Sequence, residues 1–193
     1  MTGDGAPDDR APDDAPPDRP WPVVDTEVVW DHEFFAAGYD VLERPDGERV
    51  NYYWIDANDV AVIVPVTDDG RVVLIEERSR QLRGRTVGCP AGRCEDGETH
   101  AEAAARELRE ETGYRAGTLE PLGTFRPDAW VRMDAAVFAA TELRAGERDL
   151  DDAESITVRE VPADEALATA LDAEVVHGTQ VVPLLFAHEA GLL

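Results

Sequence analysis

Three glutamates near the middle of the chain, Glu107, Glu110 and Glu111, are spaced so that they can act together. On a helix, residues three and four apart lie on one face within a single turn. Like charges stacked in this way destabilise a helix unless something neutralises them. A hard divalent cation with oxygen ligands would do so, and Mg²⁺ is the usual cation of phosphate chemistry. The alternative is a solvated acidic face in an acidic protein.

The sequence predicts where the helix that carries these glutamates begins and ends. Thr99 can cap the start of a helix rich in Ala, Glu and Arg, and Glu102 can complete a capping box. The helix is expected to run to about Thr112 and to end at Gly113, as helices commonly end at glycine. The segment before it, residues 76–98, is rich in glycine and is expected to be a loop.

Other elements are predicted from composition and turn signals. Strands rich in β-branched and aromatic residues are expected at 28–30, 34–42, 49–55, 60–66, 71–75, 119–125, 133–142 and 155–161. Residues 45–47 predict a turn and residues 68–70 a hairpin. Two further helices are expected at 162–173 and 180–190. Alternating strands with few helices indicate an α+β or α/β sandwich.

The residues around the glutamates form a longer pattern. From Gly92 the sequence has five residues, Glu98, seven residues, and then Arg106-Glu107-Leu108-Arg109-Glu110-Glu111-Thr112-Gly113-Tyr114. This resembles the signature of the Nudix hydrolase family, Gly-x5-Glu-x7-Arg-Glu-(aliphatic)-x-Glu-Glu-x-Gly-(aliphatic). The one departure is Tyr114, where the family usually has Ile, Leu or Val. A match of this length is far more specific than a short glycine motif.

The resemblance implies a fold and a set of roles. The fold is α/β, a Nudix-type α/β/α sandwich with a mixed central sheet and a short N-terminal antiparallel strand region. Glu107, Glu110 and Glu111 would coordinate Mg²⁺, with Mn²⁺ as the alternative. Arg106 and Glu98 would form a salt bridge that orients the helix, although an ordinary surface ion pair is the simpler reading of Arg106. The reaction would be metal-assisted hydrolysis of a nucleoside diphosphate linked to another group, X.

Outside the signature, the chain resembles the ADP-ribose pyrophosphatase branch from about residue 30 to residue 186. The carbonyl of Ala91, in the Pro-Ala-Gly that enters the signature, would be a further metal ligand. Arg80 lies where the branch has a substrate-contacting arginine, with Arg78 as a second candidate; either could be a surface arginine instead. Trp130 could stack on a base or be buried. The favoured reaction is therefore cleavage of ADP-ribose to AMP and ribose 5-phosphate.

An acidic segment at residues 151–156 resembles a loop of this branch. In the branch, that loop supplies a further metal ligand or the catalytic base. Glu154 is the preferred candidate and Asp152 the second, and a solvated loop is the alternative. Gly88 departs from the branch, which usually has Glu two residues before the proline. NADH, a nucleotide sugar or a dinucleoside polyphosphate therefore stay open as substrates. A non-catalytic nucleotide sensor is also open, although the intact set of glutamates argues against it.

The charge balance limits the classes of partner. The chain has 42 acidic residues against 18 basic ones, all of them Arg, and a formal net charge of −24. Such a surface repels nucleic-acid backbones and anionic membranes, so neither is expected as a partner. The acidic residues are spread along the whole chain rather than gathered in a tail. We infer a halophilic protein from a salt-rich cytoplasm, where screening removes most self-repulsion.

Composition also divides the chain. Residues 1–22 contain six Asp and six Pro, and they predict a disordered acidic tail. Residues 23–193 predict one Nudix domain, with N-terminal strands at 23–57 and a catalytic core at 58–193. Two cysteines, no visible secretory signal and no apolar stretch long enough to span a bilayer predict a cytoplasmic protein. The branch resemblance further implies a homodimer joined through the N-terminal strands.

Overall fold

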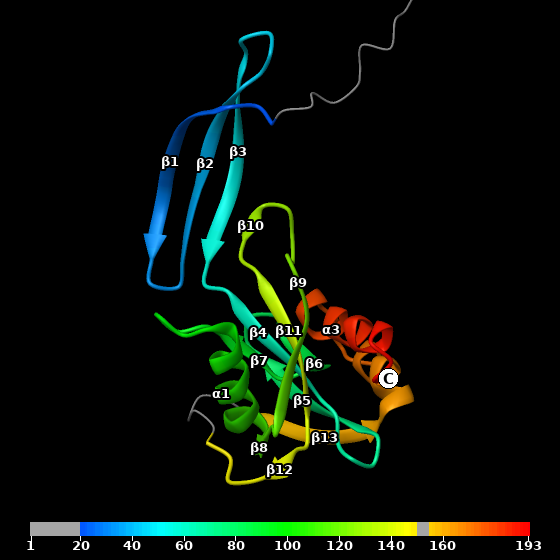
Figure 1. Ribbon diagram of the computed structural model, residues 1–193. Helices are drawn as coiled ribbons and strands as arrows, with labels where there is room; N and C mark the ends of the chain where they lie inside the picture. The colour runs from blue at the N-terminus through cyan, green and yellow to red at the C-terminus, as the bar shows by residue number, and fades with distance from the viewer. Residues whose placement is uncertain (1–19, 150–154) are drawn as a thin grey trace, which may run out of the picture.

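The computed structural model describes residues 20–149 and 155–193, so most of the predicted acidic tail lies outside the described residues. The first strands form a sheet that projects from the rest of the molecule (Figure 1). Its strands are β1 (Val23–His32), β2 (Phe35–Glu43), β3 (Arg49–Ala57) and the short β10 (Val131–Arg132), in that order across the sheet. The first three run antiparallel, and β10 pairs with β3 in parallel.

Two sheets make up the body of the protein. The mixed sheet has the order β7-β4-β11-β9, formed by Ala91–Arg93, Val60–Pro65, Ala135–Thr141 and Thr118–Phe125. Its two central strands, β4 and β11, are parallel. The second sheet is antiparallel, with β5 (Arg71–Ser79) between β13 (Ile156–Pro162) and β6 (Gly84–Gly88). A small ribbon pairs β8 (Tyr114–Arg115) with β12 (Arg144–Ala145).

Helices cover both faces of the mixed sheet. Helix α1 (His100–Thr112) lies on one face, and α3 (Gly178–Glu189) lies on the other with the shorter α2 (Ala166–Leu171) and a 3₁₀ turn at Ala163–Glu165 (Figure 1). This is the α/β/α arrangement that the family resemblance implied. Within the part of the chain that the structure describes, no helix is both long and apolar enough to span a membrane.

The alternation of side chains along β4 explains the two-sided core. Successive residues of a strand point to opposite faces of its sheet. Ala61 and Ile63 pack in a buried cluster with Leu108 of α1, whereas Val62 and Val64 pack in another with residues of α2 and α3. Burial on both faces gives the continuous apolar run that the sequence shows at β4.

Three expectations about elements need correction. The N-terminal strand predicted at 28–30 spans Val23–His32, because pairing with β2 extends it through polar residues. The loop predicted at 76–98 contains the end of β5 and all of β6 and β7, which partner strands hold in place despite their glycines. The turn before Arg71 forms, with the Gly70 amide donating to the Thr67 carbonyl at 3.0 Å, but the strands on either side then enter different sheets.

Candidate functional site

Helix α1 begins and ends where its sequence predicts. The hydroxyl of Thr99 accepts a hydrogen bond from the Glu102 amide at 3.3 Å, and the Glu102 carboxylate accepts from the Thr99 amide at 2.9 Å. Gly113 adopts φ 79°, the left-handed conformation that glycine takes easily, and its amide donates to the Arg109 carbonyl. These caps fix the helix, and the helix in turn fixes the direction of its glutamates.

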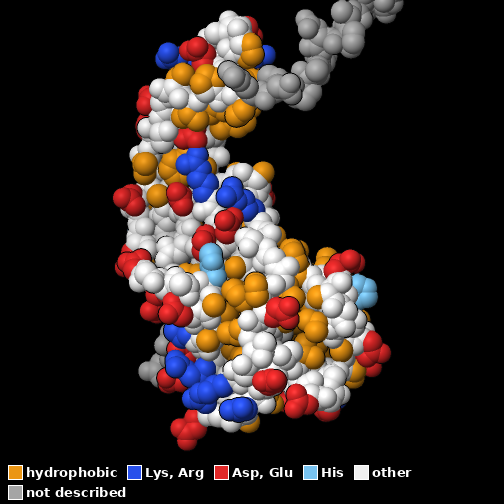
Figure 2. All heavy atoms as spheres, viewed as in Figure 1, with side chains coloured by type: hydrophobic (Ala, Val, Ile, Leu, Met, Phe, Trp, Pro, Cys, Tyr) orange, Lys and Arg blue, Asp and Glu red, His pale blue; other side chains and the backbone are white. Residues whose placement is uncertain are grey.

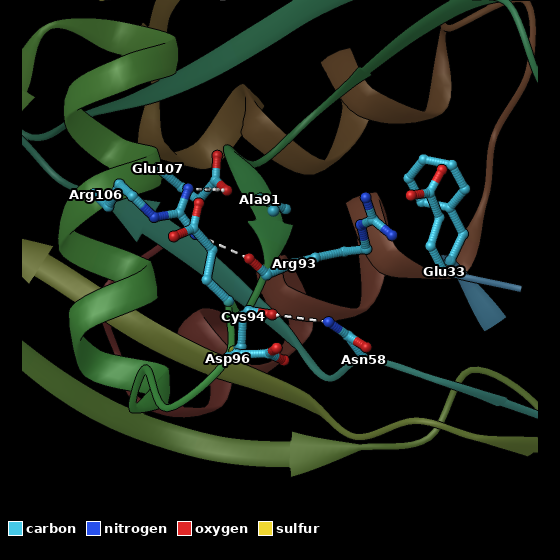
Figure 3. A pocket seen from close by; sticks show the side chains of 11 residues that line it. Glu33, Asn58, Ala91, Arg93, Cys94, Asp96, Arg106 and Glu107 are labelled. Carbon is cyan, nitrogen blue, oxygen red and sulfur yellow. Dashed lines mark hydrogen bonds and ion pairs between the residues drawn. The ribbon is translucent and has the colours of Figure 1, made fainter.

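Arg106, in the middle of this helix, is the centre of an ion-pair network. Its guanidinium donates to both carboxylate oxygens of Glu98 at 2.9 Å, to Glu107 at 2.7 Å and to Glu110 at 3.1 Å. It also donates to the Arg93 carbonyl at 2.8 Å (Figure 3). These bonds raise the pKa of Arg106, and the bond from Arg106 lowers the pKa of Glu98. The predicted salt bridge between Arg106 and Glu98 is present. The hydrogen bond from Arg106 to the Arg93 carbonyl ties the helix to strand β7.

The backbone of β7 lies directly against two of the three glutamates. The Glu111 side chain is buried and accepts a hydrogen bond from the Ala91 amide at 2.9 Å. A Cβ atom added to Gly92 would lie 1.8 Å from Oε1 of Glu107. Only glycine can occupy position 92 while Glu107 keeps this conformation, which gives the first glycine of the signature a physical reason.

All three glutamates of this face already contact groups of the protein in this structure. Arg106 contacts Glu107 and Glu110, Arg109 donates to Glu110 at 2.6 Å, and the Ala91 amide contacts Glu111. As the side chains lie, no group of three or more His, Cys, Asp or Glu residues within 20–149 and 155–193 is arranged to hold a metal ion. The candidate ligands near β7, the glutamate carboxylates and the Ala91 carbonyl, nevertheless all offer oxygen atoms. Hard divalent cations prefer oxygen ligands, so the chemistry of this set fits such an ion.

A cavity of about 620 Å³ opens beside Glu107. It is lined by Glu33, Phe34, Asn58, Ala91, Gly92, Arg93, Cys94, Glu95, Asp96, Arg106 and Glu107 (Figure 3). The Arg93 guanidinium lies over the Phe34 ring at 4.6 Å, and the Asn58 amide donates to the Cys94 carbonyl at 3.1 Å. The turn between β1 and β2 therefore reaches back to the core and forms one wall of this cavity.

A second cavity, of about 260 Å³, lies beside Glu111 and shares residues 91–93 with the first. Its other lining residues come from β4, β5, the segment after β6, helix α1 and the N-terminal end of α3: Val60, Ile75, Glu77, Cys89, Glu111, His177, Thr179 and Gln180. Burial lowers the pKa of His177, so this imidazole is neutral at neutral pH. Sequence reasoning missed Glu77, Gln180 and Phe34, because no spacing in the chain links them to the signature.

Other predicted site residues lie apart from these two cavities. Arg78 is exposed and pairs with Glu174 at 3.7 Å, and Arg80 is exposed after β5. Trp130 lines a separate cavity of about 260 Å³ beside β3, together with Tyr52, Trp54 and Arg132 among others. Their substrate roles stay predictions. Glu154 and Asp152 lie outside the described residues.

The departure from the signature at Tyr114 has a local explanation. The ring packs beside the cluster that includes Leu108, and the hydroxyl donates to the Glu160 carboxylate on β13. This hydrogen bond raises the pKa of Tyr114. An aromatic residue here keeps the apolar contact of the usual aliphatic one and adds a link from β8, directly after α1, to β13 of the second sheet.

Comparison with known proteins places this geometry in a family. The NUDIX domain model matches residues 56–181. An ADP-ribose pyrophosphatase of Bacillus subtilis (strain 168) is 33% identical over 129 residues, which cover 65% of this chain and 70% of the relative. A CMP-5'-(N-acetyl-N-hydroxy-3-aminopropyl)phosphonate hydrolase of Streptomyces rubellomurinus (strain ATCC 31215) is 34% identical over 145 residues, covering 72% and 68%.

A solved structure shares the fold. The crystal structure of an ADP compounds hydrolase superposes with a TM-score of 0.78 at 23% identity, covering 89% of this chain and 94% of that one. The family match spans more than half of the chain, and it contains the signature helix, β7 and all of the network around Arg106. The chain therefore belongs to the Nudix hydrolase family.

Proposed function

We propose that this protein hydrolyses the pyrophosphate bond of a nucleoside diphosphate linked to X, with ADP-ribose, cleaved to AMP and ribose 5-phosphate, as the favoured substrate. One observation supports the proposal most directly. Glu107 and Glu111 lie against the backbone of residues 91 and 92, and these backbone residues line both cavities. A diphosphate at this point could extend a group into each cavity. The similarity to a pyrophosphatase named for ADP-ribose supports this choice.

The cofactor in this proposal is Mg²⁺, or Mn²⁺ in its place, held by Glu107, Glu110, Glu111 and the Ala91 carbonyl. When bound, such an ion neutralises phosphate oxygens and lowers the pKa of a bound water. Arg106 holds the helix against β7 and keeps Glu107 in place through its hydrogen bond. A carboxylate must accept the proton of the attacking water; Glu154 is the preferred candidate and Asp152 the second.

The larger cavity is the proposed site of the nucleoside. Its volume of about 620 Å³ lies within the range of roughly 300–1,000 Å³ typical of small-molecule sites. The Phe34 ring is about half exposed there, with the Arg93 guanidinium over it and the His32 ring stacked against it, so it offers an apolar contact to the nucleoside. The Arg93 guanidinium beside it offers hydrogen-bond donors in a site that is otherwise rich in carboxylates.

A substrate panel tests the proposal. The purified chain, in high salt with Mg²⁺, is offered ADP-ribose, NADH, a nucleotide sugar and a dinucleoside polyphosphate, and the products are identified. We expect AMP and ribose 5-phosphate to form fastest. Relatives of similar identity carry names for different substrates, so cleavage of another compound with ADP-ribose left intact would overturn the substrate. Binding without cleavage throughout would favour the sensor alternative.

Replacement of one glutamate tests the site itself. Glu111→Gln removes a carboxylate charge with little change of shape, and we expect turnover to fall by at least about 100-fold while the protein stays folded. Glu120→Gln is the matched control, because Glu120 is exposed on β9. Near-normal activity of the Glu111 variant would contradict the role given to this helix face.

We further propose that the protein is a homodimer joined through its N-terminal sheet. All ten residues of β1 are exposed, and β1 is an edge strand of that sheet. Val28, Val29 and Trp30 are 54%, 66% and 52% exposed. Figure 2 shows further hydrophobic side chains on the surface of the projecting sheet. Exposed apolar edge strands mark interaction surfaces. Light scattering should give the dimer mass for the native chain and a monomer for Val29→Arg; a monomeric native chain would refute the proposal.

A further inference from the structure

Among the described residues, three short segments join the projecting sheet (β1, β2, β3 and β10) to the core. Residues 58–59 lead from β3 to β4, residues 126–130 from β9 to β10, and residues 133–134 from β10 to β11 (Figure 1). In short connections of this kind, a change in a few backbone angles can turn one part of a protein against another. The groups that hold these segments therefore set where the projecting sheet lies relative to helix α1.

The residue that binds the most of these parts together is Asp59, between β3 and β4. Its carboxylate accepts a hydrogen bond from the Asp134 amide at 2.8 Å and another from the His100 ring at 3.0 Å. Its backbone carbonyl accepts from the Cys94 amide at 2.8 Å. Asp59 thereby joins the connection after β3 to the connection before β11, to the first residue of α1 and to the residue directly after β7.

The first cavity depends on the same junction. Asn58 lines this cavity, and its side-chain amide donates to the Cys94 carbonyl at 3.1 Å (Figure 3). Phe34 lines it from the projecting sheet and Arg93 from the core, and the guanidinium of Arg93 lies 4.6 Å from the centre of the Phe34 ring. Because the walls of the cavity come from two parts of the molecule, its shape depends on how those parts are oriented.

We propose that Asp59 is a positioning residue for nucleoside binding, which fixes the projecting sheet against the start of α1 and so sets the shape of the first cavity. The inference rests on the proposed function, which places the nucleoside there. Asp59 itself is not among the residues that line the cavity, so it acts through its neighbours. Arg106 and the Ala91 amide hold the glutamates of α1 separately. Loss of Asp59 should therefore weaken substrate binding and leave the chemical step intact.

Two substitutions at this position test the proposal by steady-state kinetics. Asp59→Ala removes the carboxylate, and we expect the KM for ADP-ribose to rise about tenfold while kcat stays within about twofold of the native value. Asp59→Asn keeps an oxygen that can accept from the Asp134 amide, so its KM should stay close to native. Asp56→Ala is the matched control, because Asp56 is exposed near the end of β3. A lower melting temperature of Asp59→Ala with native KM would mean a purely structural role and would overturn the proposal.

A second measurement follows the orientation directly and needs no turnover. Spin labels are attached at Asp46→Cys, in the exposed turn between β2 and β3, and at Ala105→Cys, exposed on α1. Cys94→Ser removes the partly accessible native thiol, and Cys89 is buried. Labelled chains are diluted with unlabelled ones, so that pulsed electron paramagnetic resonance measures distances within one chain. We expect the distance distribution to shift or broaden in Asp59→Ala.

The remaining variants make the outcome decisive. Asp56→Ala should leave the distance distribution unchanged. His100→Ala removes one of the two bonds to the carboxylate and should change the distribution in the same sense, even if Asp59→Ala were not to fold. One distribution shared by the native chain and both of these junction variants would overturn the inference, whatever the kinetics. Failure of the native protein to cleave ADP-ribose would overturn the proposed function, and the distance measurement would then decide by itself whether Asp59 holds the sheet.

Discussion

Replacement of Gly92 by alanine is the sharpest test of the contact between β7 and helix α1. The new Cβ atom would lie 1.8 Å from Oε1 of Glu107 and 2.0 Å from its Cδ, whereas real Cβ atoms essentially never approach another heavy atom within 3.0 Å. The carboxylate oxygen must therefore move by at least 1.2 Å, the difference between these distances. The oxygen that moves is the one that accepts the 2.7 Å hydrogen bond from Arg106.

The consequence for catalysis follows from the size of this displacement. A misplacement of about 1 Å in a catalytic group can cost about 100-fold in rate. We therefore expect Gly92→Ala to lower kcat for ADP-ribose by about 100-fold, with a change of only a few degrees in melting temperature. Gly178→Ala is the matched control, since a Cβ atom there meets nothing within 4 Å. The control should keep native activity.

A double variant separates displacement of Glu107 from general damage. If Gly92→Ala acts only through this carboxylate, then adding it to Glu107→Gln should cause little further loss, because the two changes affect one interaction. Steady-state kinetics on the four proteins measures this. Retention of at least half of the native kcat by Gly92→Ala would refute the reasoning, as would fully multiplicative losses in the double variant.

Two further predictions concern stability. Arg106 lowers the pKa of Glu98 below its ordinary value of 4.5, so this carboxylate contributes stability that is present above pH 4.5 and is lost as the pH falls through the lower, folded-state pKa. Glu98→Gln should lower the free energy of unfolding by about 1–3 kcal/mol at pH 7 and flatten its fall below pH 4.5; urea titrations that gave parallel pH profiles for both proteins would contradict this. The net charge of −24 predicts a melting temperature that rises from low to molar KCl as screening removes self-repulsion; an unchanged melting temperature would refute adaptation to salt.

The boundaries of helix α1 were predictable because the interactions that set them are local. The cap joins Thr99 and Glu102, three residues apart, and the stop needs only the left-handed conformation of Gly113. The network around Arg106 is similarly close in sequence, since Glu98, Glu107 and Glu110 lie within eight residues of it. The family signature is legible in the chain for the same reason.

The sheet arrangement was only partly predictable. The strand expected at 60–66 is present as β4, and the structure shows that it is buried on both faces. Strand β1 was predicted too short, because its exposed residues have no apolar alternation, and pairing with β2 defines its length. The glycines of residues 76–98 suggested a loop, but hydrogen bonds from partner strands remote in sequence make two strands there.

Sequence by itself determined the family, the helix and the set of carboxylates, since all of these depend on residue types at short, fixed spacings. Only the tertiary structure decided what surrounds them. Phe34, Glu77 and Gln180 come from three distant segments, and packing of the sheets and helices brings them to the two cavities beside Glu107 and Glu111. The same packing left the amide oxygen of Gln180 buried with no hydrogen-bond partner among residues 20–149 and 155–193, because burial depends on the complete fold and not on any local pattern.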